Sequence, residues 1–195
     1  MATTEKMIKD RVPRKGKRSG VVREYTFIGK VKPGQEKAMR ADLTAFLADP
    51  RRADTEGLKK VGILAALHTL FDNDTRFIGT VWFDQDFDSY FDDVFTLVGA
   101  DLYESFFRHA EGFPEKGGIT GGLSGQAGIE YAKNFLAKNH SDVLSFRVTL
   151  PELTVREQIK AQGLLTAFQK VLDHPDAEKA LQHPALKPLL ELVAE

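Results

Sequence analysis

The 195-residue sequence contains no cysteine, which excludes disulfide bonds, thiolate chemistry and cysteine-based zinc sites. No apolar run approaches the roughly 18 residues that a membrane-spanning helix needs, so no membrane span is predicted. The N-terminus is charged and lacks an apolar signal core, which argues against a secretory signal. The formal net charge of −1 gives no global attraction to nucleic acid or to anionic membranes. We therefore expect a cytoplasmic protein that does not bind nucleic acid.

Several motifs of known chemistry are also missing. Residues 117–128 contain six glycines, but a phosphate-binding loop needs a Gly-Lys-Ser/Thr ending that is absent here, and a flexible loop is the better interpretation. The stretch that begins at Asp84 starts like a calcium loop, yet Ser89 replaces the required glycine and Phe95 replaces the bidentate glutamate. No nucleophile elbow, zincin helix or kinase motif occurs.

The centre of the chain predicts a β-hairpin. Residues 62–71 are apolar in both alternating sets, with His68 in one of them, which is typical of a strand covered on both faces. Residues 72–74 are Asp-Asn-Asp, which favours a tight turn. Residues 75–83 then alternate with period two and are rich in β-branched and aromatic side chains.

A long helix is predicted for residues 84–110. Its apolar residues recur at three- and four-residue spacing and form one stripe, namely Phe87, Tyr90, Phe91, Val94, Leu97 and Val98. Eighteen residues make five whole turns, so His109 shares the face of Phe91 if the helix is unbroken. Gly99 and Ala100 are the place where an interruption would destroy this alignment.

The remaining pattern predicts two more strands and further helices. Residues 21–31 and 143–150 alternate as half-buried strands. Thr154 and Glu157 match a capping box at the start of a helix. Other helices are expected at residues 35–48, 129–136 and 185–194, with a charged connection at 49–60. We divide the chain into a basic N-terminal arm (1–20), an α+β domain (21–150) and a C-terminal helical extension (151–195).

The predicted order is strand, helix, strand, strand, helix, strand, followed by C-terminal helices. This βαββαβ order is that of an α+β, ferredoxin-like fold with a four-stranded antiparallel sheet. Helices on one face leave the other face of such a sheet bare. Because the strand at 62–71 is apolar on both faces, we expect that bare face to be buried against a second sheet.

The segments KVKPGQEKAMRADLTAFL, HTLFDNDTRFIGTVWFD and LYESFFRHAEGFP make residues 21–150 resemble the dimeric α+β barrel superfamily. The resemblance implies a homodimer or higher homo-oligomer with a small-molecule ligand. That superfamily includes heme-degrading monooxygenases, peroxidases, cofactor-free monooxygenases and members with no known chemistry. In its heme-degrading branch a histidine late in the second helix is the axial iron ligand, a place that His109 occupies here. The GxxDG motif of the dye-decolorizing peroxidases is absent.

The resemblance makes His109 the candidate heme ligand and acid/base residue. Phe91, Trp82 and Phe106 would wall the cavity, and Arg76 would pair with a carboxylate of the substrate. His68 is a second candidate for catalysis. Each has a structural alternative: a histidine that caps a helix dipole for His109, a hydrogen-bonded buried histidine for His68, core packing for the aromatic residues, and a solvated strand face for Arg76.

The sequence leaves two functions open. The first is an oxidative enzyme of the barrel type that acts on a small molecule, with heme as its candidate cofactor. The second is a non-catalytic module that joins a larger complex through the barrel interface and the basic arm. Fold alone does not choose between them, because one architecture hosts many functions.

Overall fold

The structure is a computed structural model that describes residues 16–53, 55–114 and 125–193. Its contacts divide the chain after Val155 into two units. The first unit contains five strands in its described part: β1 (Lys17–Ser19), β2 (Val22–Lys30), β3 (Ile63–Phe71), β4 (Arg76–Phe83) and β5 (His140–Ser141). All pairings between them are antiparallel, in the order β1-β2-β4-β3, and β5 also pairs with β2.

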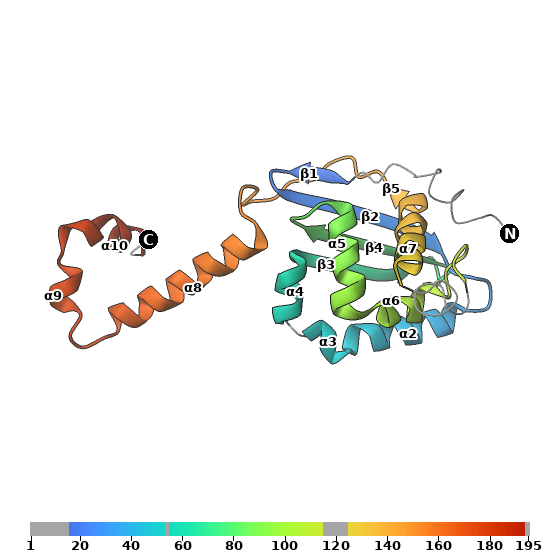
Figure 1. Cartoon of the computed structure of the whole chain (residues 1–195), viewed down its shortest axis with the longest axis horizontal. Helices are drawn as coiled ribbons and strands as arrows, with labels where there is room; N and C mark the ends of the chain where they lie inside the picture. The colour runs from blue at the N-terminus through green and yellow to red at the C-terminus, as the bar shows by residue number, and fades with distance from the viewer. Residues whose placement is uncertain (1–15, 54, 115–124, 194–195) are drawn as a thin grey trace. The chain divides into compact units, whose positions relative to one another are not determined.

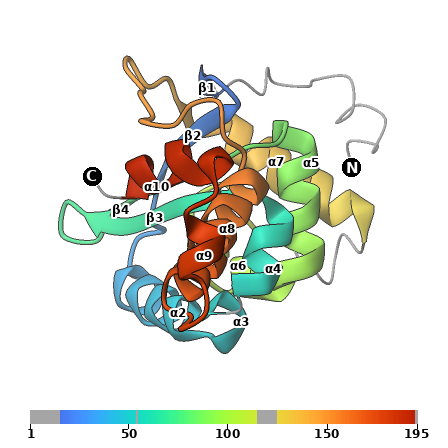
Figure 2. The same ribbon diagram turned by 90° about the vertical axis from the view of Figure 1, so that its left-hand side faces the viewer.

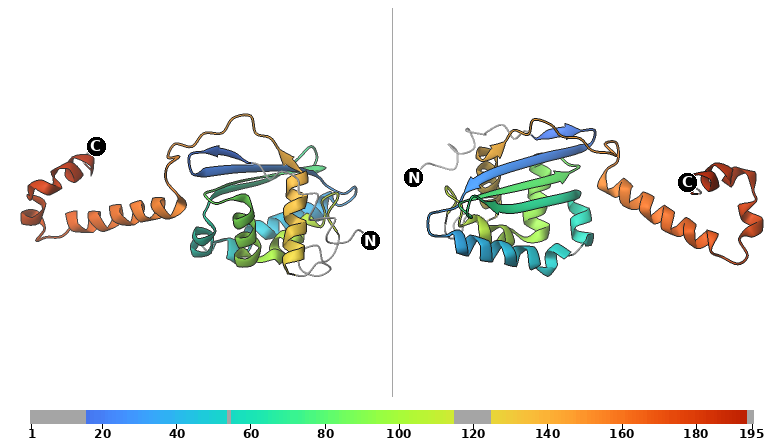
Figure 3. Two further views of the ribbon diagram at one scale, coloured as in Figure 1. Left: turned by 45° about the horizontal axis from the view of Figure 1, so that its top comes forward. Right: turned by 180° about the vertical axis from the view of Figure 1, so that it is seen from behind.

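Helices of the first unit connect the strands. They are α2 (Glu36–Ala48), α3 (Pro50–Ala53), α4 (Thr55–Val61), α5 (Phe87–Asp93), the π-helix η1 (Val94–Gly99), α6 (Ala100–Phe107) and α7 (Gln126–Lys138). The larger helices lie on one side of the sheet (Figures 1 and 3). The α+β class and the antiparallel sheet predicted from the sequence are therefore confirmed.

The core lies between the sheet and these helices and is largely aromatic. Phe27 and Phe77 reach it from neighbouring strands, each opposite a glycine of the other strand. A Cβ on Gly79 would lie 2.2 Å from the ring of Phe27, and a Cβ on Gly29 would lie 2.2 Å from that of Phe77. Two mid-strand glycines, which ordinarily weaken a strand, thus make room for two rings to lie flat on the sheet.

The central hairpin follows the prediction closely. β3 and β4 pair over their whole length except for an irregularity between Ile63 and Ala65. The turn residues Asp72, Asn73 and Asp74 all have positive φ, between 54° and 66°. Short Asx side chains tolerate this left-handed conformation.

The predicted helix over residues 84–110 is broken into three pieces. Six residues, Val94–Gly99, form a π-helix, and Gly99 has φ of 126° before α6 begins. A π-helix changes the number of residues per turn, so the five-turn alignment of His109 with Phe91 does not hold. The charged connection predicted at residues 49–60 contains two short helices, α3 and α4, that the sequence pattern did not predict.

The strand predicted at residues 143–150 does not form. The edge of β2 is already in use, since Ser19 and Lys17 of β1 pair with Val22 and Glu24, and β5 pairs with the next residues of β2. Residues 143–150 are irregular, and Leu144 is 93% exposed.

Two predicted segments lie only partly within the described ranges. Of the basic arm, residues 17–19 belong to the sheet as β1, while residues 1–15 lie outside the described residues. Of the glycine-rich segment, residues 117–124 lie outside them, and the remainder leads into α7, whose first residue is Gln126.

The second unit begins at Arg156 and is helical. It contains α8 (Val155–Leu172, whose first residue belongs to the first unit), α9 (Glu178–Leu181), the 3₁₀ turn η2 (Pro184–Leu186) and α10 (Lys187–Val193). These agree with the helices predicted after Thr154 and near the C-terminus, and α9 is an addition to them. No helix in the described ranges has the length and apolar character that crossing a membrane requires.

Candidate functional site

Among the described helices of the first unit, none lies on one of the two faces of the sheet, which we call the open face (Figure 3, right). Cross-strand register places four rows of side chains on it, opposite in direction to the core residues Tyr25, Phe27 and Val81. From one end to the other these rows are Glu24–Trp82–Ala65, Thr26–Thr80–Leu67, Ile28–Ile78–Thr69 and Lys30–Arg76–Phe71.

The first two rows contain a buried polar cluster. Glu24 is 2% exposed, and the hydroxyl of Thr26 donates to its Oε1. The hydroxyls of Thr26 and Thr80 lie 2.8 Å apart, so one of them donates to the other. Oε2 of Glu24 is buried and has no hydrogen-bond partner among the described residues. Burial raises the pKa of Glu24; the bond from Thr26 lowers it less than burial raises it, and the nearby charge of Asp142 raises it further.

The other side chains of the open face are mainly apolar or long. Ile28, Ile78 and Trp82 are half-buried, and Leu67 is 48% exposed. At the far end the guanidinium carbon of Arg76 lies 5.1 Å from the centre of the Phe71 ring, a cation–π contact. The open face therefore combines a neutralisable carboxyl at one end, apolar groups in the middle and two cations, Lys30 and Arg76, at the other end.

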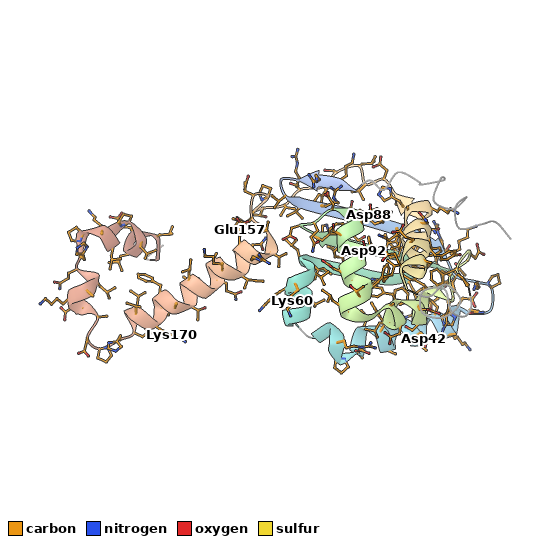
Figure 4. The ribbon with its side chains drawn as sticks, viewed as in Figure 1. Asp42, Lys60, Asp88, Asp92, Glu157 and Lys170 are labelled. Carbon is orange, nitrogen blue, oxygen red and sulfur yellow. The ribbon has the colours of Figure 1, made fainter. Side chains whose placement is uncertain are left out.

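His109 lies on the other side of the sheet, just after α6. Its backbone carbonyl accepts from the amide of Lys32, which ties the end of α6 to the chain that leaves β2. Its ring is buried against α2: Nδ1 lies 2.5 Å from Oε1 of Gln35, and Nε2 donates to Oδ2 of Asp42 at 2.7 Å. Asp42, labelled in Figure 4, also accepts a hydrogen bond from Arg108 at 2.7 Å.

Through these contacts, His109 links the end of α6 to α2 and to the residue before α2. Burial alone raises the pKa of Asp42, but hydrogen bonds from Arg108 and His109 outweigh it and hold the pKa below its usual value. An axial heme ligand needs one ring nitrogen directed at the iron, whereas both nitrogens of His109 face side chains of α2 and the residue before it. In this arrangement the residues around His109 do not fit a heme iron.

The other predicted site residues are divided between the two sides of the sheet, and of them Phe106 is bonded to His109, its carbonyl accepting from the His109 amide at 3.1 Å. Phe91 and Phe106 lie in the aromatic core, while Trp82 and Arg76 lie on the open face. His68 points to the core side of β3, where its ring meets Phe46 and Phe106 edge-on at 5.3 and 5.9 Å. The sheet therefore separates Trp82 and Arg76 from the other predicted site residues.

One charged cluster was not predicted from the sequence. Lys133 of α7 is 1% exposed, and its Nζ lies 2.8 Å from Asp92 Oδ1, 2.8 Å from Glu130 Oε1 and 3.3 Å from Asp88 Oδ1. Asp88 and Asp92 belong to α5, which lies beside α7 (Figures 2 and 4). Burial lowers the pKa of Lys133, but the bonds to Asp92 and Glu130 outweigh it, and the net pKa is raised. The sequence did contain a hint of this cluster: Lys133 lies between Ala132 and Phe135, which are both buried residues of α7.

No group of metal-ligating side chains that could hold an ion occurs among the residues that the structure describes. Comparison with known proteins gives no relative: no family model, no curated protein and no solved structure matches this chain. We take the open face as the candidate site, because it combines a buried carboxyl, apolar side chains and two cations.

Proposed function

We propose that the protein is a binding and assembly module that forms a homodimer through the open face of its sheet. The observation that supports this is the contrast between the two faces. Within the described residues of the first unit, one face is covered by helices and buried, whereas the other carries no helix and presents Leu67, 48% exposed, together with the half-buried Ile78 and Trp82. Exposed apolar groups that are contiguous on a folded domain mark an interaction surface.

The connections of the sheet support a particular arrangement of the dimer. The chain passes from β2 through α2 to β3, returns in β4 between them, and reaches β5 on the far edge of β2 after α5–α7. This order is compatible with the split βαβ, ferredoxin-like motif, which we include in the proposal. In the proposed dimer two such sheets pack face to face, about 10 Å apart, as in a dimeric α+β barrel.

A second copy is the partner that the composition of the open face favours. A two-fold interface brings the same patch together with itself, so its apolar middle meets the apolar middle of the other copy. The ends differ in charge: Lys30 and Arg76 lie at one end, and the carboxyl of Glu24, whose pKa burial raises, lies at the other. If the strands of the two sheets run in opposite directions, the two cationic ends lie apart, which avoids repulsion across the interface.

A matched pair of leucines tests the proposal. Leu67 is 48% exposed on the open face, and Leu97 is 56% exposed on η1. Leu67→Glu places a charge inside the proposed interface, and we expect it to raise the dimer dissociation constant at least 100-fold, about 2.7 kcal/mol. Leu97→Glu makes the same chemical change outside the interface and should leave the native mass at that of a dimer.

Native mass spectrometry and sedimentation of the wild type and both variants give the answer. A wild type that stays monomeric across the micromolar range would refute the proposal. So would a dimer that both variants retain, because the open face would then not be the interface.

A further inference from the structure

The strand β3 forms one edge of the sheet (Figure 3, right) but has the sequence of an interior strand. Its nine residues, ILAALHTLF, are apolar in both alternating sets and include no proline, lysine, arginine or carboxylate. Such runs are typical of strands enclosed in a sheet and covered on both faces. Among the described strands only β4 pairs with β3, and none of its nine residues is fully buried.

The opposite edge of the sheet is protected in the usual ways. β1 has only three residues, two of which are Lys17 and Arg18, and β5 has only two residues. Short edge strands and edge cations prevent strands of other chains from pairing. β3 has neither, and its one irregularity lies at its beginning, between Ile63 and Ala65. A long, uncharged edge of this kind is a template for another strand.

Backbone bonds at the two ends of β4 determine which groups of β3 point outward. The amide of Val31 donates to the carbonyl of Thr75 at 2.8 Å, so Thr75 points to β2. The amide of Asp84 donates to the carbonyl of Gly62 at 3.1 Å, so Asp84 points to the β3 side. Because successive residues of an antiparallel strand point to opposite sides, the even-numbered residues of β4 bond to Ala65, Leu67, Thr69 and Phe71. The backbone groups that point to the outer edge belong to the residues between these, Ala66, His68 and Leu70.

We propose that this edge pairs antiparallel with the same edge of a second copy, with the two-fold axis beside His68. The amides of Ala66 and Leu70 have no backbone partner among the described residues. In the proposed register Ala66 of one copy and Leu70 of the other exchange both of their backbone hydrogen bonds, and symmetry repeats this pair across the axis. This register matches all three outward residues, and no charged side chains of β3 meet, because the strand has none.

A second copy is the occupant that the described chain favours. Its own remaining segment with strand-like alternation, residues 143–150, is held at the other edge: the amide of Val148 donates to the hydroxyl of Ser19, and the amide of Val21 donates to the carbonyl of Pro151. β2 and β4 lie between that edge and β3. Pairing of β3 with itself needs no further sequence, and the lengths of the two strands match.

The size of this contact makes it a weak one by itself. The regular part of β3, residues 65–71, is about 24 Å long, and a sheet is about 10 Å thick, which gives roughly 240 Å² per copy. A standard stable interface needs ~800 Å² per partner. We therefore expect association through the edge between about 1 µM and 1 mM protein.

The homodimer proposed above would strengthen the contact, and in this respect the inference rests on the proposed function. If the open faces meet with their strands in opposite directions, both β3 strands of the dimer lie on the same side. Two dimers whose symmetry axes cross beside His68 then join through two such contacts at once and close a tetramer.

Amide hydrogen exchange of the full-length protein, read residue by residue by mass spectrometry with fragmentation, tests the pairing. The amides of Leu67 and Thr69, which point to β4, are the internal control for those of Ala66 and Leu70. At about 1 mM protein we expect all four amides to be protected to within about tenfold. At about 1 µM the amides of Ala66 and Leu70 should exchange at least about 100-fold faster than the other two.

A proline variant tests the same bonds by mass. Ala66→Pro removes one outward N–H and no bond to β4, and proline is tolerated on an edge strand whose N–H faces outward. Ala66→Val is similar in size and keeps the N–H. At about 1 mM protein we expect sedimentation to show the larger assembly for the wild type and Ala66→Val, and its loss in Ala66→Pro.

The outcomes separate this inference from the proposed function. If the amides of Ala66 and Leu70 exchange rapidly at every concentration, or if Ala66→Pro keeps the mass of the wild type, the edge pairing is refuted, and a protein that is dimeric at micromolar concentration still supports the open-face homodimer. If the protein is monomeric at micromolar concentration and these amides become protected as the concentration rises, the open-face homodimer is refuted and the edge pairs by itself.

Discussion

The buried Lys133 provides the sharpest test of how the helices are held on the sheet. Its ammonium is within 3.3 Å of three carboxylates, two of them on α5. Removing one partner of a fully buried ion pair costs about 3–5 kcal/mol, because the other charge stays buried. Here the carboxylate side chains of Asp88, Asp92 and Glu130 remain 52%, 40% and 31% exposed and can hydrate. We therefore expect Lys133→Met, which keeps most of the apolar stem, to cost about 2 kcal/mol.

The measurement is urea unfolding followed by the fluorescence of Trp82, the one tryptophan of the chain. A loss of about 2 kcal/mol corresponds to a fall in Tm of roughly 4–8 °C for a domain of this size. Lys138→Met is the matched control, since Lys138 lies on the same helix but is exposed, and its effect should stay within about 0.5 kcal/mol. Equal stability of the two variants would show that the three carboxylates do not hold α7 through Lys133.

Three further substitutions test the structure, two in the first unit and one in the second. Because burial raises the pKa of Glu24 above its ordinary value of 4.5, the folded state keeps this proton to higher pH than the unfolded chain. The resulting stability is complete below pH 4.5 and is lost as the pH rises through the folded pKa. Urea midpoints of the wild type should therefore decline over that window more than those of Glu24→Gln, and parallel profiles would contradict the burial effect. Gly99→Ala should cost about 1–3 kcal/mol, because Gly99 has φ of 126° and a Cβ there would lie 2.8 Å from Arg51 and Asp101. Gly163→Ala, where a Cβ meets nothing within 4 Å, should instead stabilise α8 by about 0.5–1 kcal/mol, and thermal unfolding of both variants compares them.

The sequence predicted the hairpin well because its signals are local. Alternation in 62–71 and 75–83 determines which side chains share a face, and residues 72–74 are of types that tolerate positive φ. The same local signal failed at 143–150. That segment alternates as a strand should, but β1 and β5 occupy the edge of β2 that it would need. Competition for a sheet edge is a tertiary effect that no pattern within the segment reveals.

The prediction of one continuous helix over residues 84–110 failed for a different reason. Most of its predicted apolar stripe is buried, including Phe87, Phe91 and Val94, but Leu97 is 56% exposed. The spacing of apolar residues does not reveal a π-helix, which changes the number of residues per turn. One irregular turn rotates everything after it, and the expected alignment of Phe91 with His109 depended on that count. Gly99 was the visible warning in the sequence.

The most informative residue of the candidate site, Glu24, could not be recognised from its neighbours. Residues 21–31 read as a strand with one polar face, and in such a strand a glutamate is ordinarily solvated. Glu24 is buried although that face carries no helices. A buried carboxyl is tolerated when it is neutral or hydrogen-bonded, and here Thr26 supplies one bond while burial raises the pKa. Because Glu24 is already buried within the single chain, its burial comes from the chain's own side chains, and only the folded structure identifies it as an unusual carboxyl.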